Sequence, residues 1–151
     1  MQKYTCTSCS YVYNPFIGDE QTPEGTFFDA LEESWACPHC GEWKEYFQEI
    51  PENFQEISNM SQATEGELKH IPFYTERADE IVIRMGTPEN PHPRSENHFI
   101  EYVGLFETDG ELIDIKIQPE DDIITFPNPG LDEYEVRLSC NLHGVWRGIK
   151  I

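Results

Sequence analysis

The chain has 151 residues, enough for one ordinary domain or two small ones. It carries 29 acidic residues against 10 Lys and Arg, a formal net charge of −19, which argues against nucleic acid or an anionic membrane as a partner. No apolar run approaches the roughly 20 residues of a membrane span, and no secretory signal pattern precedes Cys6. We therefore expect a soluble, cytoplasmic protein.

The cysteines divide the chain into two parts. Cys6, Cys9, Cys37 and Cys40 lie near the N-terminus, and Cys140 is the next one. Five thiols cannot all pair as disulfides, and nothing in the sequence indicates secretion. Metal-bound thiolates in a reducing compartment fit this pattern better. We predict a small first domain over residues 1–47, a linker over 48–66 and a second domain over 67–151.

The first domain contains two C-x-x-C motifs, Cys6 with Cys9 and Cys37 with Cys40. Each motif lets two sulfurs face one tetrahedral ion while nearby backbone N–H groups stabilise the thiolates. Two such motifs complete a four-sulfur shell, which suits either iron or zinc. These residues alone do not separate the two metals.

The same region resembles rubredoxin nearly from end to end. The matching segments are residues 4–9, 11–15, 18–19, 25–28 and 35–41, with Phe47 in the closing position. The resemblance implies one iron held by four cysteines that carries one electron; a structural zinc domain is the alternative. One position departs from the family: Ser10 stands where glycine usually follows the second cysteine, a place where positive φ is easy only for glycine. Gly41 keeps the pattern in the second motif.

The linker and the second domain differ in pattern. Residues 48–66 are rich in turn-forming residues and show no sustained helical period, which favours a linker. From residue 67 onward, short runs alternate apolar and polar residues between turn clusters; these runs are residues 80–85, 98–106, 112–117, 123–126, 134–138 and 145–149. Six or seven short antiparallel strands are typical of a β-sandwich, so the whole chain is predicted to be mostly β.

Four histidines and one thiol in the second domain form a possible second metal site. They are His70, His92, His98, Cys140 and His143, the last two in the motif Cys140-Asn141-Leu142-His143-Gly144. Any one of these histidines alone would more often be structural than a ligand. Together they offer nitrogen and sulfur ligands to a single ion, so we predict that they converge.

Residues 67–151 resemble the superoxide reductases of the neelaredoxin and desulfoferrodoxin type. The matching motifs are Lys69-His70-x-Pro72, His92-Pro93, the run 98–102 and the Cys140–Gly144 motif. The resemblance implies an immunoglobulin-like sandwich and an iron with the four histidines as equatorial ligands and Cys140 as the axial ligand. It also implies reduction of superoxide to hydrogen peroxide, a homodimer or homotetramer, and an external electron donor, either a rubredoxin or a reductase. The attached rubredoxin-type domain is a plausible conduit.

Two residues beside the ligands bear on catalysis. Lys69 is similar to the family's lysine at the open face of the iron, where a cation would attract superoxide and orient a proton-donating water. The family usually has glutamate directly before that lysine, but this chain has Leu68 there and Glu67 one residue earlier. In an extended segment, one residue of displacement turns a side chain to the opposite face. We expect Glu67 to be a weak or absent sixth ligand, and an electron carrier or redox sensor with little reductase activity is the alternative function.

Overall fold

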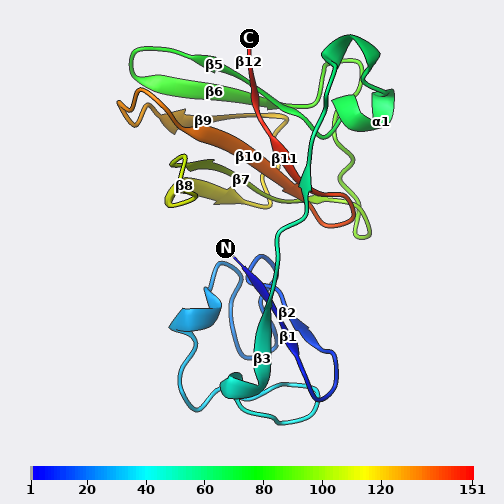
Figure 1. Ribbon diagram of the computed structural model, residues 1–151, viewed down its shortest axis with the longest axis vertical. Coiled ribbons are helices and arrows are strands. Elements are labelled where there is room, and N and C mark those ends of the chain that lie inside the picture. Colours follow the sequence, from blue (N-terminus) through cyan, green and yellow to red (C-terminus); the bar gives the residue numbers. More distant parts are fainter. Residues whose placement is uncertain (1) are drawn as a thin grey trace. The chain divides into compact units, whose positions relative to one another are not determined.

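The computed structural model describes residues 2–151 and is mostly β, which confirms the predicted fold class. The chain divides into two compact units, Met1–Glu52 and Asn53–Ile151 (Figure 1). The helices of the described residues are single short turns, and none of them has the length and apolar composition needed to span a membrane.

The N-terminal unit is a three-stranded antiparallel sheet with an aromatic core. Its strands are β1 (Lys3–Cys6), β2 (Val12–Tyr13) and β3 (Phe47–Ile50), in the order β2-β1-β3. Two 3₁₀ turns, Phe28–Ala30 and Lys44–Tyr46, complete it. Tyr13, Phe28, Trp35 and Phe47 pack ring against ring, with centroid separations of 5.2 to 5.9 Å. This core backs the buried cysteines Cys6 and Cys37, so the first predicted metal site rests on rigid packing.

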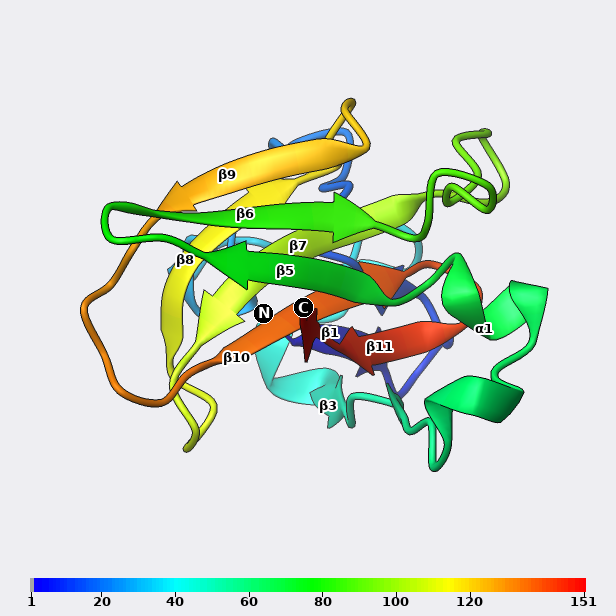
Figure 2. The same ribbon diagram turned by 90° about the horizontal axis from the view of Figure 1, so that it is seen from above.

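The C-terminal unit is a sandwich of two sheets (Figure 2). Its strands in chain order are β4 (Phe54–Gln55), β5 (Pro72–Glu76), β6 (Glu80–Met85), β7 (Ile100–Phe106), β8 (Leu112–Ile117), β9 (Ile123–Pro127), β10 (Glu135–Cys140), β11 (Gly144–Arg147) and β12 (Ile149–Lys150). One sheet has the order β4-β11-β10-β7-β8 and the other β12-β5-β6-β9. The core lies between them.

Alternation of side chains places that core. In β6, Ile81, Ile83 and Met85 are fully buried and their neighbours are only half-buried. From the other sheet, Val103 of β7 and Leu138 of β10 belong to the same apolar cluster. Burial of this continuous apolar surface is the main stabilising contribution to the sandwich.

Two strand pairs differ from the all-antiparallel sandwich that the sequence pattern predicts. β11 pairs with β4, and β12 with β5, in parallel. The run 145–149, predicted as one strand, is divided between the two sheets at Gly148. A Cβ on Gly148 would lie 2.7 Å from Val136 Cβ and 3.0 Å from the Pro72 carbonyl oxygen, so glycine lets the chain cross between the sheets here.

Residues 48–66, predicted as a linker, carry more structure than their composition indicates. β3 extends to Ile50, β4 adds an edge strand to the sandwich, and a 3₁₀ turn forms at Met60–Gln62. A single helical turn, α1 (Glu65–Leu68), then leads directly to Lys69 and His70.

Candidate metal centres

The four N-terminal cysteines converge on one point. Their sulfurs all lie within 4.8 Å of one another, with Cys6 Sγ 3.7 Å from Cys40 Sγ and Cys9 Sγ 3.6 Å from Cys37 Sγ. All four are free thiols, two buried and two more accessible. Four thiolates this close would repel one another strongly without a cation between them, so the donor set fits a tetrahedral metal ion.

The two C-x-x-C motifs have matching backbone turns. Ser10 N–H donates to the Cys6 carbonyl at 2.9 Å, and Gly41 N–H donates to the Cys37 carbonyl at 2.8 Å. Both donors lie in the left-handed region, with φ of 64° for Ser10 and 81° for Gly41. The turn therefore imposes positive φ on a serine, which costs energy that glycine avoids.

A second cluster forms at one end of the sandwich. Ring nitrogens of His70, His98 and His143 and the sulfur of Cys140 lie within 4.8 Å of one another. His92 lies beside them, with its ring centroid 4.8 Å from that of His70 and 4.9 Å from that of His98. All five residues predicted as ligands are therefore gathered in one place, although they come from four separate segments of the chain.

Backbone carbonyls fix which nitrogen of each buried imidazole faces the cluster. His70 Nδ1 lies 2.6 Å from the Gly66 carbonyl of α1, and His92 Nδ1 lies 2.7 Å from the Pro93 carbonyl. An Nδ1–H that donates to a carbonyl leaves Nε2 as an acceptor or metal ligand. His70 Nε2 and His98 Nε2 are 3.4 Å apart, and His92 Nε2 is buried without a hydrogen-bond partner. An ion between these nitrogens would satisfy all three.

Burial favours the neutral form of three of these imidazoles. Burial lowers the pKa of His70 to about 4 and the pKa of His92 to about 3. Burial also lowers the pKa of the half-buried His98, and the neighbouring His143 and Lys69 act in the same direction. Neutral imidazole is the form that binds a metal, so protons do not compete for these ligands near neutral pH.

The turn between β10 and β11 and the loop that carries His98 complete the cluster. Cys140 pairs with Gly144 across the turn, and His143 Nδ1 lies 3.5 Å from Cys140 Sγ. Asn141 fastens this turn to the His98 loop: its Oδ1 accepts from Phe99 N–H at 2.9 Å, and its Nδ2 donates to the Asn97 carbonyl at 3.1 Å. The Asn141 side chain thus holds Asn97 and Phe99, the two neighbours of the candidate ligand His98.

An open cavity of about 520 Å³ lies against the cluster. His70, His98 and His143 contribute to its wall, and so does Lys69. The remaining lining residues are Asn53, Gln55, Thr64, Gly66, Glu67, Leu142 and Trp146. A small anion entering here would meet the lysine cation and the candidate ligands together.

Glu67 lies in that wall, but its carboxylate is engaged elsewhere. It accepts hydrogen bonds from the backbone N–H of Thr64 at 2.7 Å and from the Thr64 hydroxyl at 2.9 Å, forming a capping box at the start of α1. The segment is a helical turn rather than the extended chain that the sequence argument assumed. Leu68 packs against the apolar core instead of facing the cluster.

Sequence reasoning overlooked several residues of this site. Asn141 looked like part of a ligand motif, Thr64 like part of a linker, and Asn53 and Gln55 lie in a segment without a periodic pattern. The T-x-x-E spacing of Thr64 and Glu67 is a capping signal that could have revealed the helical turn. Trp146, whose ring stacks on His70 at 5.0 Å, carried no comparable signal.

Comparison with known proteins assigns both domains. Residues 3–47 match the family described as Rubredoxin, and residues 62–149 match the family described as Desulfoferrodoxin. Rubredoxin-2 of Chlorobaculum tepidum is 46% identical over 52 residues, covering 33% of this chain and 100% of that protein. A desulfoferrodoxin homolog of Methanothermobacter thermautotrophicus is 34% identical over 83 residues, covering 54% of this chain and 64% of that protein. The superoxide reductase from Treponema pallidum aligns in structure with a TM-score of 0.45 at 27% identity, covering 69% of this chain and 87% of that one.

A four-cysteine site on a rubredoxin-type domain and a separate site of four histidines and one cysteine define an oxidoreductase with two iron centres. The chain belongs to the desulfoferrodoxin family and carries a rubredoxin domain at its N-terminal end. Both resemblances noted in the sequence are thereby confirmed.

Proposed function

We propose that this protein is a superoxide reductase, which converts superoxide to hydrogen peroxide. The observation that carries the proposal is the cluster of four histidines and one cysteine with Lys69 on the wall of an open cavity. In this proposal the ligands of the catalytic iron are His70, His92, His98, His143 and Cys140. The N-terminal iron is held by Cys6, Cys9, Cys37 and Cys40.

The donor set suits a one-electron reduction. Iron(II) bound there supplies one electron to superoxide, and two protons complete hydrogen peroxide. Neutral imidazoles add no negative charge around the metal, while the thiolate of Cys140 is a strong electron donor to it. The carbonyl contacts of His70 and His92 hold these rings in one orientation, so the site needs little rearrangement during the reaction.

Lys69 supplies the positive charge that an anionic substrate needs on this acidic protein. It lies directly before His70, is half-buried, and lines the cavity. Its ammonium group would attract superoxide over the last few ångströms and hold a water that delivers a proton to the product. This local charge matters because the chain as a whole carries −19.

Glu67 has no place among the metal ligands in this proposal. Its carboxylate would have to give up two hydrogen bonds from Thr64 to reach the cluster, and α1 would lose its cap. We infer that Glu67 serves the helical turn that presents Gly66 to His70, and that the open side of the site stays free of protein carboxylate.

Each turnover consumes an electron that must come from outside the site. A rubredoxin or a reductase is the external donor that we propose. The rubredoxin domain of the same chain offers a one-electron carrier of matching stoichiometry, so it is a conduit for that electron.

Metal analysis combined with the visible spectrum and rapid mixing tests this proposal. We expect two irons per chain and rapid oxidation of the reduced second centre by superoxide. A protein with two irons that does not react with superoxide would instead be an electron carrier or redox sensor. One zinc and one iron would make the N-terminal domain a structural module. The full-length variant Cys40→Ala separates the centres: the reaction with superoxide should persist, while turnover with an external donor should slow.

A further inference from the structure

The segment that joins the two domains is also part of the sandwich. Neither family match covers residues 48–61, yet β4 within that stretch pairs with β11, with Phe54 opposite Val145 and Gln55 opposite Trp146. The backbone N–H of Val145 donates to the Asn53 carbonyl at 2.8 Å. Asn53 and the edge strand β4 therefore lie beside Val145, which follows the candidate ligand His143 by two residues.

Gly144 makes this close approach possible. It has a φ of 79°, and a Cβ built on it would overlap the carbonyl oxygen of Asn53 and lie 3.3 Å from Asn53 Cβ. Any larger residue would push β4 away from the sheet as well as strain the backbone. Because Gly144 directly follows His143 and pairs with Cys140, the backbone of Asn53, which leads into β4, packs against the turn that carries two candidate ligands.

The side chains of residues 53–55 alternate between two environments. Asn53 and Gln55 line the cavity beside Lys69. Phe54, between them, lies under two guanidinium groups, with its ring centre 5.0 Å from Arg137 and 4.4 Å from Arg147. One side of the strand thus forms cavity wall while the other is clamped to the sheet.

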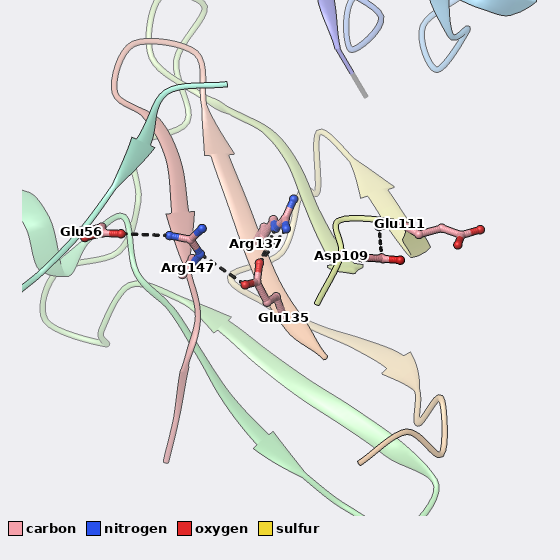
Figure 3. A network of polar contacts seen from close by, with 6 residues as sticks. All are labelled: Glu56, Asp109, Glu111, Glu135, Arg137 and Arg147. Atoms are coloured by element: carbon pink, nitrogen blue, oxygen red, sulfur yellow. Dashed lines mark hydrogen bonds and ion pairs between the residues drawn. The ribbon is translucent and has the colours of Figure 1, made fainter. Parts of the chain in front are cut away.

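Ion pairs surround the contact of Phe54 with Arg137 and Arg147, which we call the clamp. Arg147 contacts Glu56 at 3.3 Å and Glu135 at 3.5 Å, and Arg137 contacts Glu135 at 2.7 Å (Figure 3). Figure 3 shows Arg147 between Glu56, which follows β4, and Glu135 at the start of β10. These contacts bridge β4, β11 and β10, so the position of residues 53–55 is fixed by more than the short backbone ladder.

His143 is the candidate ligand that most needs such support. His70 and His92 are buried and each is held by a backbone carbonyl, whereas His143 is exposed. Within the described residues its ring contacts Cys140 Sγ but makes no hydrogen bond to a backbone carbonyl. Its position depends on the turn between Cys140 and Gly144, and β4 packs directly against that turn.

We propose that residues 53–55 are a positioning element of the second metal centre. The backbone of Asn53 holds the Cys140–Gly144 turn, and with it His143, while Asn53 and Gln55 form part of the cavity wall. The consequence for superoxide entry rests on the proposed function; the support of His143 does not. The segment that joins the two domains would then help to position a metal ligand as well as connect the domains.

The variant Phe54→Ala in the full-length, iron-loaded protein tests this inference, because Phe54 is not a candidate ligand and is not among the residues that line the cavity. Loss of the clamp should raise hydrogen exchange at the Val145 amide by about tenfold. It should also shift or broaden the visible charge-transfer band of the oxidised second centre as His143 loosens. Phe73→Ala is the matched control, since Phe73 is also a half-buried phenylalanine but lies on β5 in the other sheet. It should leave Val145 exchange and the band unchanged.

Gly144→Ala gives an independent test and should raise Val145 exchange in the same way; if it does not fold, Phe54→Ala decides alone. Unchanged Val145 exchange in Phe54→Ala would overturn the inference, and so would faster exchange with an unchanged band. The two proposals can fail separately. If Phe54→Ala raises Val145 exchange and shifts the charge-transfer band, but the wild-type protein does not react with superoxide, the positioning role is supported and the proposed function is contradicted.

Discussion

The carboxylate of Glu67 and the backbone N–H of Thr64 are joined by a hydrogen bond of 2.7 Å, and Glu67 N–H returns a bond of 3.2 Å to the Thr64 hydroxyl. This reciprocal pair closes the single turn of α1. The turn presents the Gly66 carbonyl to His70 Nδ1 at 2.6 Å. A glutamate near the metal site is therefore used to orient a candidate ligand rather than to be one.

Replacing Glu67 tests this role. Glu67→Ala should lower the melting temperature by a few degrees because the cap is lost, and any change in the visible spectrum of the oxidised second centre should arise through His70. Glu67→Gln should retain the cap, since glutamine also completes a capping box. Glu65→Ala is the control, as Glu65 lies in the same turn without the reciprocal bonds. A spectral change in Glu67→Gln, which keeps the cap but has no carboxylate, would show that the carboxylate reaches the iron.

The same pair predicts a pH dependence. Hydrogen bonds from the Thr64 backbone and hydroxyl lower the pKa of Glu67 below its ordinary value of 4.5. Because the folded pKa is the lower one, the charged cap stabilises the fold above about pH 4.5, and this contribution is lost as pH falls through the folded pKa. The stability difference between wild type and Glu67→Ala should shrink as pH falls below 4.5. Chemical unfolding at several pH values would measure it, and a constant difference would contradict the cap.

Lys69 should control the encounter with superoxide. Lys69→Ala is expected to slow the second-order reaction about tenfold at low salt, because the local positive charge is lost. The remaining negative charge should then make added salt accelerate the reaction rather than slow it. Stopped-flow or pulse measurements at several ionic strengths would show both effects. Lys116→Ala, on β8, is the control, and equal effects of the two variants would exclude a local role for Lys69.

Asn141 should govern how firmly the site holds its metal. Asn141→Ala removes the side-chain bonds to Phe99 N–H and the Asn97 carbonyl, so the His98 loop is held to the Cys140 turn only by backbone contacts such as the bond from Asn141 N–H to the Phe99 carbonyl. Iron affinity measured by chelator competition should fall about 10–100-fold, as for other residues that orient metal ligands. Asn128→Ala is the control, because Asn128 bonds loop backbone elsewhere in the sandwich. Similar losses in both variants would point to general destabilisation.

The positive φ of Ser10 should strain the backbone of the first domain, and glycine at this position should relieve that strain. Ser10→Gly is expected to stabilise that domain by about 1 kcal/mol, since the φ of 64° suits glycine. The reverse change, Gly41→Ser, should destabilise it by a similar amount, because Gly41 also has a positive φ and no neighbouring atom lies within 4 Å of the position that a Cβ would take. Unfolding followed by the colour of the four-cysteine centre would report both. Equal stability of wild type and Ser10→Gly would mean that the turn tolerates serine.

Both metal sites could be predicted from the sequence because metal ligands are recognised by residue type, here cysteine and histidine. Paired C-x-x-C motifs bring sulfurs together locally, and four histidines with one distant thiol left few other partners for an ion. The mostly β class followed from alternation in runs such as Ile81, Ile83 and Met85, whose burial the structure shows.

The missed features depend on contacts that no local pattern records. β4 has two residues and docks only because Gly144 leaves room for Asn53. α1 is too short to show a helical period, so the sequence pattern around Glu67 does not distinguish a helical turn from an extended segment. The crossing at Gly148 depends on Val136 and Pro72, which are distant in sequence.

The most direct test of superoxide reductase activity is the stoichiometry of the reaction between superoxide and the reduced, two-iron protein. A superoxide reductase should form one hydrogen peroxide for each superoxide consumed, oxidise its second iron centre in step, and release no dioxygen. Release of dioxygen with half that yield of peroxide would indicate dismutation and contradict the proposed reductase activity. An absence of reaction while both irons are present would contradict it as well.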